Sequence, residues 1–258
     1  MRSFSNKISI SKNSRGVFSL DTIMGCPQGF SNLDLFGYNN GCYNECYAGK
    51  YSKIYGYDFS KAVKRDFLND AHLNIIRKKL KSLEYIRIGT SGDPSHDWDH
   101  TFKVLYNICD YVKNIVIVTR HWNNIPSKYF DFIKEYSIIF NSSISVLDSE
   151  KLYNNCLKQY NVLSSITKSY LRVVSCEFNV YKRQGFILHN KQLRLLKNKN
   201  VIETVLRLSK NSHYIESGLI IAKNVFFLKN EVLVSIRNDK IYFGSCENCK
   251  QKCGVCYS

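Results

Sequence analysis

Three cysteines near the N-terminus have the residue type and the spacing of a cluster site. Cys26, Cys42 and Cys46 form a C-x15-C-x3-C array. A structural zinc ion normally takes four protein ligands, whereas three thiolates suit an iron–sulfur cluster that keeps one iron open. Free core cysteines are the alternative, but the surrounding loop is rich in Gly and Asn. We therefore expect this array to bind metal.

A second group of cysteines lies near the C-terminus with the spacing C-x2-C-x3-C-x2-C. Its members are Cys246, Cys249, Cys253 and Cys256. Zinc ribbons usually separate their two C-x2-C pairs by roughly a dozen residues or more, so the short spacing favours a ferredoxin-type run. We expect a second [4Fe–4S] cluster here, with zinc as the alternative. The other cysteines stand in apolar surroundings and are expected in the core: Cys109, Cys156 and Cys176.

A glycine-rich turn follows a short apolar run at residues 84–88. The turn consists of Gly89, Thr90, Ser91, Gly92, Asp93 and Pro94. Glycine lets a backbone come close to a ligand, and carbonyl groups with a nearby carboxylate can receive an ammonium group. Gly-Asp-Pro is also ordinary turn chemistry. The turn is therefore a candidate binding element only in combination with the cysteines.

Alternating strands and helices are predicted to bring these motifs together. Strands are expected at 19–25, 84–88, 114–120 and 171–176, extended segments at 137–140 and 143–147, and helices at 42–55, 60–80, 102–112, 127–135 and 152–160. Residues 192–208 have a helical or mixed pattern, and 219–228, 231–237 and 240–243 look like antiparallel strands. Such alternation predicts a parallel sheet with its chemistry at the carboxyl ends of the strands. The cysteine loop and the 89–94 turn each follow a strand, so both are expected on that rim.

Composition and charge limit the class of protein and its partners. A chain of 258 residues with 44% hydrophobic content can bury one sizeable core. Its net charge of +16 favours polyanionic partners such as nucleic acid, although A/T-rich codons would also raise the Lys content. Since we find no apolar leader and no run of membrane-spanning length, we expect no membrane partner and a reducing, cytoplasmic location. In that compartment clustered cysteines usually serve metal or redox chemistry.

Polar residues beyond the turn are further candidates for contact with a substrate. The first group comprises His96, Asp97, Asp99 and His100. The alternative to substrate contact is that these residues form the solvated start of a helix, where an aspartate is favourable. Arg120, at the end of a predicted strand, is placed to pair with a carboxylate or a phosphate, or is an ordinary surface arginine.

Tyrosines and lysines alternate after the third cysteine. The stretch contains Tyr43, Tyr47, Tyr51, Tyr55 and Tyr57, together with Lys50 and Lys53. Aromatic rings beside positive charge can stack on nucleic-acid bases. Packing in the core is the more usual fate of tyrosines, and we expect it here.

The combined motifs resemble the radical S-adenosylmethionine (SAM) superfamily. The resemblance is carried by Gly25-Cys26, Gly41-Cys42, Cys46-Tyr47-Ala48 and the later 89–94 turn. It is strongest to phage-associated, radical-SAM-like proteins with a split cysteine motif, and it covers roughly residues 19–149. The common motif is a continuous C-x3-C-x2-C. Here Gly49 stands where its third cysteine would follow Cys42 and Cys46, so Cys26 must supply a ligand.

The resemblance implies a fold and a set of cofactors. The fold is α/β, a partial (β/α) barrel of parallel strands at 19–190, with a basic lead-in at 1–18 and a C-terminal cysteine-rich extension at 191–258. A [4Fe–4S] cluster on the three N-terminal cysteines would bind SAM, with the 89–94 turn and Arg120 among the SAM contacts. An electron donor such as flavodoxin or ferredoxin would reduce the cluster.

The implied reaction is the reductive cleavage of SAM to a 5′-deoxyadenosyl radical, which abstracts hydrogen from a substrate. Because of the positive charge and the phage-like resemblance, we expect a nucleic-acid base or nucleotide as that substrate. Two alternatives stay open. One is a non-catalytic metal–cysteine protein that binds nucleic acid, and the other is a radical SAM enzyme that modifies a peptide.

Overall fold

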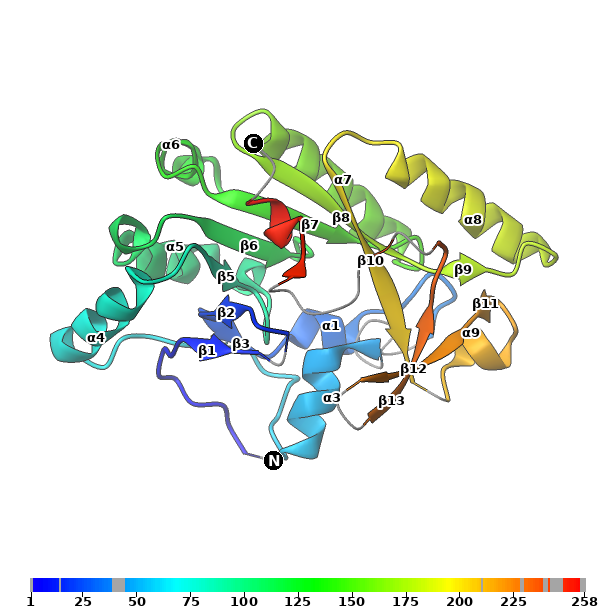
Figure 1. Ribbon diagram of the computed structural model, residues 1–258, viewed down its shortest axis with the longest axis horizontal. Helices are drawn as coiled ribbons and strands as arrows, with labels where there is room; N and C mark the ends of the chain where they lie inside the picture. The colour runs from blue at the N-terminus through cyan, green and yellow to red at the C-terminus, as the bar shows by residue number, and fades with distance from the viewer. Residues whose placement is uncertain are drawn as a thin grey trace.

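The computed structural model describes residues 2–13, 15–38, 45–209, 211–227, 230–238, 241 and 248–255. These residues form a mixed α/β architecture around one large, mostly parallel sheet (Figure 1). The strand order in the described part of the chain is β1-β2-β5-β6-β7-β8-β10-β13-β12. Each pair of neighbours from β2 to β10 is parallel, whereas β1, β13 and β12 are antiparallel to their neighbours.

The strands of this sheet are β1 (Ser11–Lys12), β2 (Phe18–Ser19), β5 (Ile86–Ile88), β6 (Ile115–Thr119), β7 (Ile139–Ile144), β8 (Ser169–Ser175), β10 (Val201–Leu208), β12 (Lys223–Phe227) and β13 (Asn230–Ser235). Two short ribbons accompany it. One pairs β3 (Ile23–Met24) with β4 (Val63–Lys64), and the other pairs β9 (Glu177–Phe178) with β11 (Ile220–Ile221).

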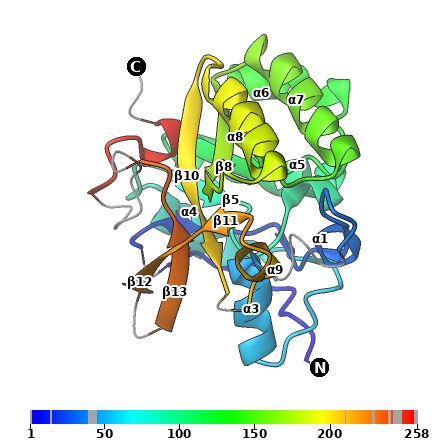
Figure 2. The same cartoon turned by 90° about the vertical axis from the view of Figure 1, so that its right-hand side faces the viewer.

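The α-helices are α1 (Pro27–Ser31), α3 (Tyr47–Ile54), α4 (Asp70–Leu80), α5 (Trp98–Tyr106), α6 (Phe130–Glu135), α7 (Glu150–Ser164), α8 (Arg183–Leu196) and α9 (His213–Glu216). Short 3₁₀ turns are η1 (Pro94–His96), η2 (Cys109–Tyr111), η3 (Ser127–Tyr129) and η5 (Lys252–Gly254). Helices α5 to α8 cover one face of the sheet (Figure 2). Within the described ranges, no helix has the length and apolarity needed to cross a bilayer.

Strand β6 shows why the sheet is buried on both faces. Successive strand residues point to opposite faces, and both faces of β6 are apolar. Ile115 and Ile117 pack into the cluster under the helices, together with Phe102 of α5. Val116 packs on the other face against Tyr170 of β8. The sheet therefore needs a cover on the face away from the helices as well.

The C-terminal segment supplies part of that cover. Cys253 and Val255 pack against the cluster around Val116 and Tyr170. The amide of Asn141 donates a hydrogen bond to the carbonyl of Cys253 at 3.0 Å. The Tyr170 hydroxyl donates to the Gly254 carbonyl at 3.2 Å. Residues 249–255 are thus tied to the sheet on the face opposite the helices (Figure 2).

The α/β class and the parallel sheet are confirmed, with strands close to the predicted 84–88, 114–120 and 171–176 segments. The extended segments at 137–140 and 143–147 are one strand, β7. The helix predicted at 60–80 is wrong before residue 70. Residues 63–64 form β4, and the Asn69 side chain accepts a hydrogen bond from the His72 N–H, which starts α4 later.

Two other predicted segments divide into separate elements. The strand expected at 19–25 is interrupted between β2 and β3, where the Asp21 side chain turns toward the 89–91 backbone. The mixed segment at 192–208 contains the end of α8 and all of β10. Because β10 is parallel to β8, the parallel sheet extends past residue 190. Most of the strand predicted at 240–243 lies outside the described residues.

Candidate functional site

Cys26 is fixed directly beside the glycine turn. It follows β3 and Gly25, whose φ of +84° is strained for any residue with a side chain. The Gly25 N–H donates to the Ser91 carbonyl at 3.1 Å, and the Cys26 N–H donates to the Phe59 carbonyl at 2.8 Å. The first predicted ligand and the 89–94 turn therefore share the carboxyl-terminal rim of the sheet, as expected.

Cys26 and Cys46 belong to the same hydrophobic cluster although twenty positions separate them in the chain. Cys26 is the residue before α1, and Cys46 is the residue before α3. Both pack in one cluster with Ala48, Phe59 and Trp122. Cys42 lies outside the described residues. Among the described residues no group of three or more His, Cys, Asp or Glu side chains is arranged to hold a metal ion, so the third thiolate stays a prediction.

His96 and Trp122 beside Cys26, and Gln28 on the helix that follows it, carry buried polar atoms that the described part of the chain does not satisfy. His96 Nε2 lies 3.1 Å from Cys26 Sγ, and the His96 ring stacks parallel to Trp122 with centroids 6.5 Å apart. Gln28 Oε1, His96 Nδ1 and Trp122 Nε1 have no hydrogen-bond partner there. Burial lowers the pKa of His96 and favours its neutral form. Since buried polar atoms are normally paired, these atoms indicate that a further polar group belongs beside Cys26.

Gly29→Ala is expected to reduce metal binding at this site. A Cβ at Gly29 would lie 2.8 Å from Cys26 Sγ and 3.7 Å from the Trp122 ring. The sulfur would have to move, and its contact with His96 would be lost. Iron content after reconstitution should fall, whereas Ser31→Ala on the exposed end of α1 should retain it. Full iron content in Gly29→Ala would show that the sulfur position has no role.

The glycine turn is organised by a buried carboxylate that the sequence did not single out. Asp21 accepts hydrogen bonds from the N–H groups of Gly89, Thr90 and Ser91 at 3.0, 2.6 and 3.0 Å. Burial raises the pKa of Asp21, and the hydrogen bonds from Thr90 and Ser91 oppose that rise. These three donors face Asp21. The turn can therefore offer a ligand its carbonyl oxygens, but not these N–H groups.

Asp93 joins the turn to the end of β6. Its carboxylate accepts from the Ser95 N–H and hydroxyl, from the Thr119 hydroxyl at 2.7 Å and from the Arg120 N–H at 2.7 Å. The sequence presented Asp93 as a carboxylate for an ammonium group. The structure gives it four protein donors, and its evident role is to position the residues that follow β6.

Arg120 is paired with a carboxylate of the protein itself. Its guanidinium binds the Asp148 carboxylate, and the two side chains are only 17% and 7% exposed. Burial raises the pKa of Asp148, and Arg120 opposes that rise. The guanidinium carbon also lies 5.8 Å from the Trp122 ring centroid. Arg120 is thus a largely buried residue of the rim, and the surface-arginine alternative is wrong.

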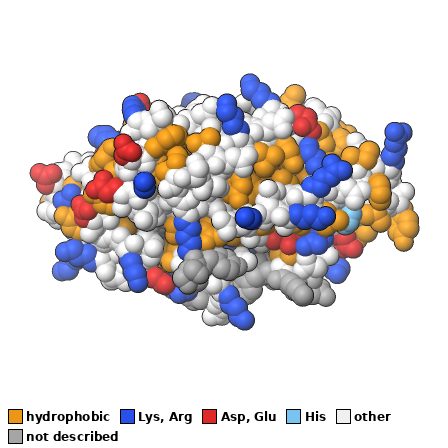
Figure 3. All heavy atoms as spheres, turned by 90° about the horizontal axis from the view of Figure 1, so that it is seen from above, with side chains coloured by type: hydrophobic (Ala, Val, Ile, Leu, Met, Phe, Trp, Pro, Cys, Tyr) orange, Lys and Arg blue, Asp and Glu red, His pale blue; other side chains and the backbone are white. Residues whose placement is uncertain are grey.

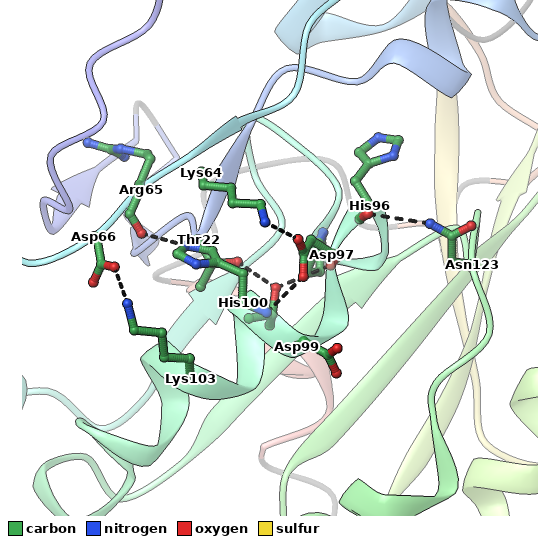
Figure 4. Close-up of polar contacts among 12 residues, drawn as sticks. Thr22, Lys64, Arg65, Asp66, His96, Asp97, Asp99, His100, Lys103 and Asn123 are labelled. Carbon is green, nitrogen blue, oxygen red and sulfur yellow. Dashed lines mark hydrogen bonds and ion pairs between the residues drawn. The ribbon is translucent and has the colours of Figure 1, made fainter.

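The four candidates after the turn separate into one site residue and three structural residues (Figure 4). Asp97 caps α5 and pairs with Lys64. Asp99 pairs with Lys128 and Tyr129, and His100 Nε2 lies 2.9 Å from the Arg65 carbonyl oxygen. The His96 ring points away from this network, and only His96 among the four contacts Cys26.

Cys253, one of the C-terminal cysteines, lies at the opposite end of the strands from Cys26. Cys253 packs near the first residues of β6, β7, β8 and β10, whereas Cys26 lies beside the turn that follows β5. Cys249 is described and half-buried, and Cys246 and Cys256 lie outside the described residues. Cys253 is therefore separate from the place where Cys26 and Cys46 pack. The three cysteines expected in the core, Cys109, Cys156 and Cys176, are buried.

Sequence reasoning missed Asp21, Gln28, Trp122 and Asp148. Trp122 offered the best signal, because it follows a strand end within a polar run, Thr119-Arg120-His121-Trp122. The other three carry no local pattern and are revealed by contacts between distant segments. Comparison with known proteins adds nothing to this geometry, since no protein-family model, no curated protein and no solved structure matches the chain.

Proposed function

We propose that this chain is a radical SAM-type iron–sulfur enzyme. Cys26, Cys42 and Cys46 would hold a [4Fe–4S] cluster, and SAM would bind between that cluster and the 89–94 turn. The observation that carries the proposal is that Cys26 and Cys46 pack in one hydrophobic cluster, with Cys26 beside the turn on the carboxyl-terminal rim of the sheet and next to unsatisfied polar atoms. Parallel α/β sheets place their chemistry on that rim.

The residues present at this site fit a [4Fe–4S] cluster with SAM bound beside it. Thiolates are the usual ligands of iron–sulfur clusters, and two of the three proposed ligands lie in one cluster of side chains. Gln28, His96 and Trp122 offer polar atoms to a molecule bound beside Cys26. When bound, the cluster and SAM would supply an electron and a 5′-deoxyadenosyl radical for hydrogen abstraction.

The chain's own residues would bind and orient SAM and exclude water from the site. Asp21 holds the turn in one conformation, and Asp93 fixes that turn to the end of β6. The Arg120–Asp148 pair and the Trp122 ring form the neighbouring wall. A second [4Fe–4S] cluster, or zinc, at the C-terminal cysteines and an electron donor such as flavodoxin or ferredoxin complete the proposal, with a nucleotide or nucleic-acid base as substrate.

Anaerobic reconstitution followed by metal analysis and a SAM-cleavage assay tests the proposal. We expect about four irons at the N-terminal site and formation of 5′-deoxyadenosine with a strong reductant. Cys46→Ala should lose both the iron and the product. Cys109→Ala removes a thiol buried in a different core cluster, the one under the helices, and should retain both. Iron without SAM cleavage, or zinc in place of iron, would refute the catalytic proposal.

One observation favours a second candidate, a non-catalytic metal–cysteine protein that binds nucleic acid. His96 Nε2 lies 3.1 Å from Cys26 Sγ, so the histidine could join three cysteines as a fourth ligand. Three Cys and one His are a common structural zinc set. In that case zinc would be bound in about equimolar amount, and His96→Ala would release it.

A further inference from the structure

Helix α3 presents a row of exposed tyrosines. Tyr47, Tyr51 and Tyr55 are four residues apart, so they lie on one side of the helix and its C-terminal end. Their side chains are 52%, 49% and 54% exposed. The core packing expected for them is therefore wrong. Tyr57 is different, because its ring stacks on Phe4 at 4.7 Å, and Tyr43 lies outside the described residues.

We call Tyr47, Tyr51 and Tyr55 the α3 tyrosine face. It begins next to Cys46 of the proposed cluster site and extends along the helix to its C-terminal end. Cys46 precedes the first tyrosine, and α3 projects from the lower edge of the molecule (Figure 1). The rings of Tyr51 and Tyr55 lie 4.4 Å apart and make one continuous aromatic surface. Beyond it a shallow hollow is lined by Arg2, Ile54, Tyr55 and Gly56.

Positive charge accompanies this aromatic surface. Arg2, which lines the hollow together with Tyr55, forms no ion pair with any carboxylate that the structure describes, so its charge is available to a partner. Lys53 is two positions from both Tyr51 and Tyr55, so it lies on the opposite side of α3. Lys50 on the same helix pairs with Glu45 at 3.3 Å. On the face shown in Figure 3, by contrast, Lys and Arg are scattered among acidic and apolar side chains. Exposed rings on α3 and the charge of Arg2 from the N-terminal segment therefore meet at the C-terminal end of the helix.

We propose that the α3 tyrosine face is the docking surface for a single-stranded nucleic acid. Bases would stack on Tyr51 and Tyr55, and a phosphate would lie near Arg2. Base stacking on tyrosine needs an exposed base face, which a single strand offers and a duplex does not. The net charge of +16 is complementary to the phosphates. The inference rests on the proposed function in one respect: a strand held on α3 would carry a nucleotide to the neighbouring cysteine site.

Binding of a labelled oligonucleotide to the reconstituted full chain tests this surface without requiring SAM cleavage. Fluorescence anisotropy with one mixed sequence of about ten nucleotides, prepared as single-stranded DNA, as single-stranded RNA and as DNA duplex, identifies the preferred form. We expect a single strand to bind more tightly than the duplex. The double variant Tyr51→Ala/Tyr55→Ala should raise the Kd by about tenfold or more.

Matched variants separate stacking from other effects. Tyr51→Phe keeps an aromatic face and should bind like the wild type. Tyr181→Ala removes an equally large ring, 96% exposed, between β9 and α8, and should also bind like the wild type. Arg2→Gln should reduce the slope of log K against log salt concentration by about 0.7.

The outcomes distinguish this inference from the proposed function. Wild-type protein that binds neither single strand, or a Tyr51→Ala/Tyr55→Ala variant that binds as tightly as the wild type, would overturn the α3 surface even if SAM is cleaved. Tyrosine-dependent binding without SAM cleavage would establish the surface and refute the radical mechanism.

Discussion

Asp21→Ala is expected to lower the free energy of unfolding by about 3–5 kcal/mol, a large loss for one side chain. Asp21 is buried, and its carboxylate accepts hydrogen bonds from three consecutive backbone N–H groups in the 89–91 segment. Alanine would leave these half-buried donors without their partner. The same change would release the turn against which Gly25 and Cys26 are held.

Urea unfolding of the metal-free protein measures this effect. Asp21→Asn offers an oxygen to two of the donors but turns an NH₂ group toward the third, so we expect an intermediate loss. Asp131→Ala is the matched control, because Asp131 lies exposed in the first turn of α6 and contributes about 1 kcal/mol or less. If Asp21→Ala lost no more stability than Asp131→Ala, the three hydrogen bonds would not hold the turn.

The sequence predicted those parts of the fold that depend on local pattern. The continuous apolar run of β6 and the strand–helix alternation indicated a parallel sheet buried on both faces, which the structure confirms. The late start of α4 was missed, because helical spacing of apolar residues continues upstream of the Asn69 cap. The interruption between β2 and β3 was missed for another reason. Asp21 leaves the strand to bind a segment 68 to 70 residues away.

In the candidate site, too, some features could be predicted from the sequence and others could not. Spacing alone indicated that Cys26 and Cys46 belong together, and the structure places them in one cluster. Spacing could not separate His96 from Asp97, Asp99 and His100, since all four lie within five consecutive positions of the sequence. The direction of each side chain decides that question, and only the His96 ring turns toward Cys26. Exposure of the α3 tyrosines likewise depends on what packs against the helix.

Acid is expected to destabilise the wild-type protein by about 3 kcal/mol more than the His121→Asn variant between about pH 6.5 and about pH 4. His121 follows β6, is fully buried, and its Nε2 lies 2.8 Å from the Ser142 hydroxyl. Burial lowers the pKa of His121 to about 4, from an ordinary value of 6.5. Between these two values the unfolded chain binds a proton that the folded chain does not, so stability falls as the pH falls.

Asparagine is the informative replacement because His121 has a φ of +55°, a conformation that Asn tolerates better than most residues. The variant lacks the titrating group, so its free energy of unfolding, measured in urea across this pH range, should fall less steeply than that of the wild type. His189→Asn, in α8, should keep the wild-type profile. Parallel profiles for the wild type and His121→Asn would contradict the prediction. Because Arg120 and Trp122 flank His121, protonation of this histidine would disturb the same rim on which Cys26 lies.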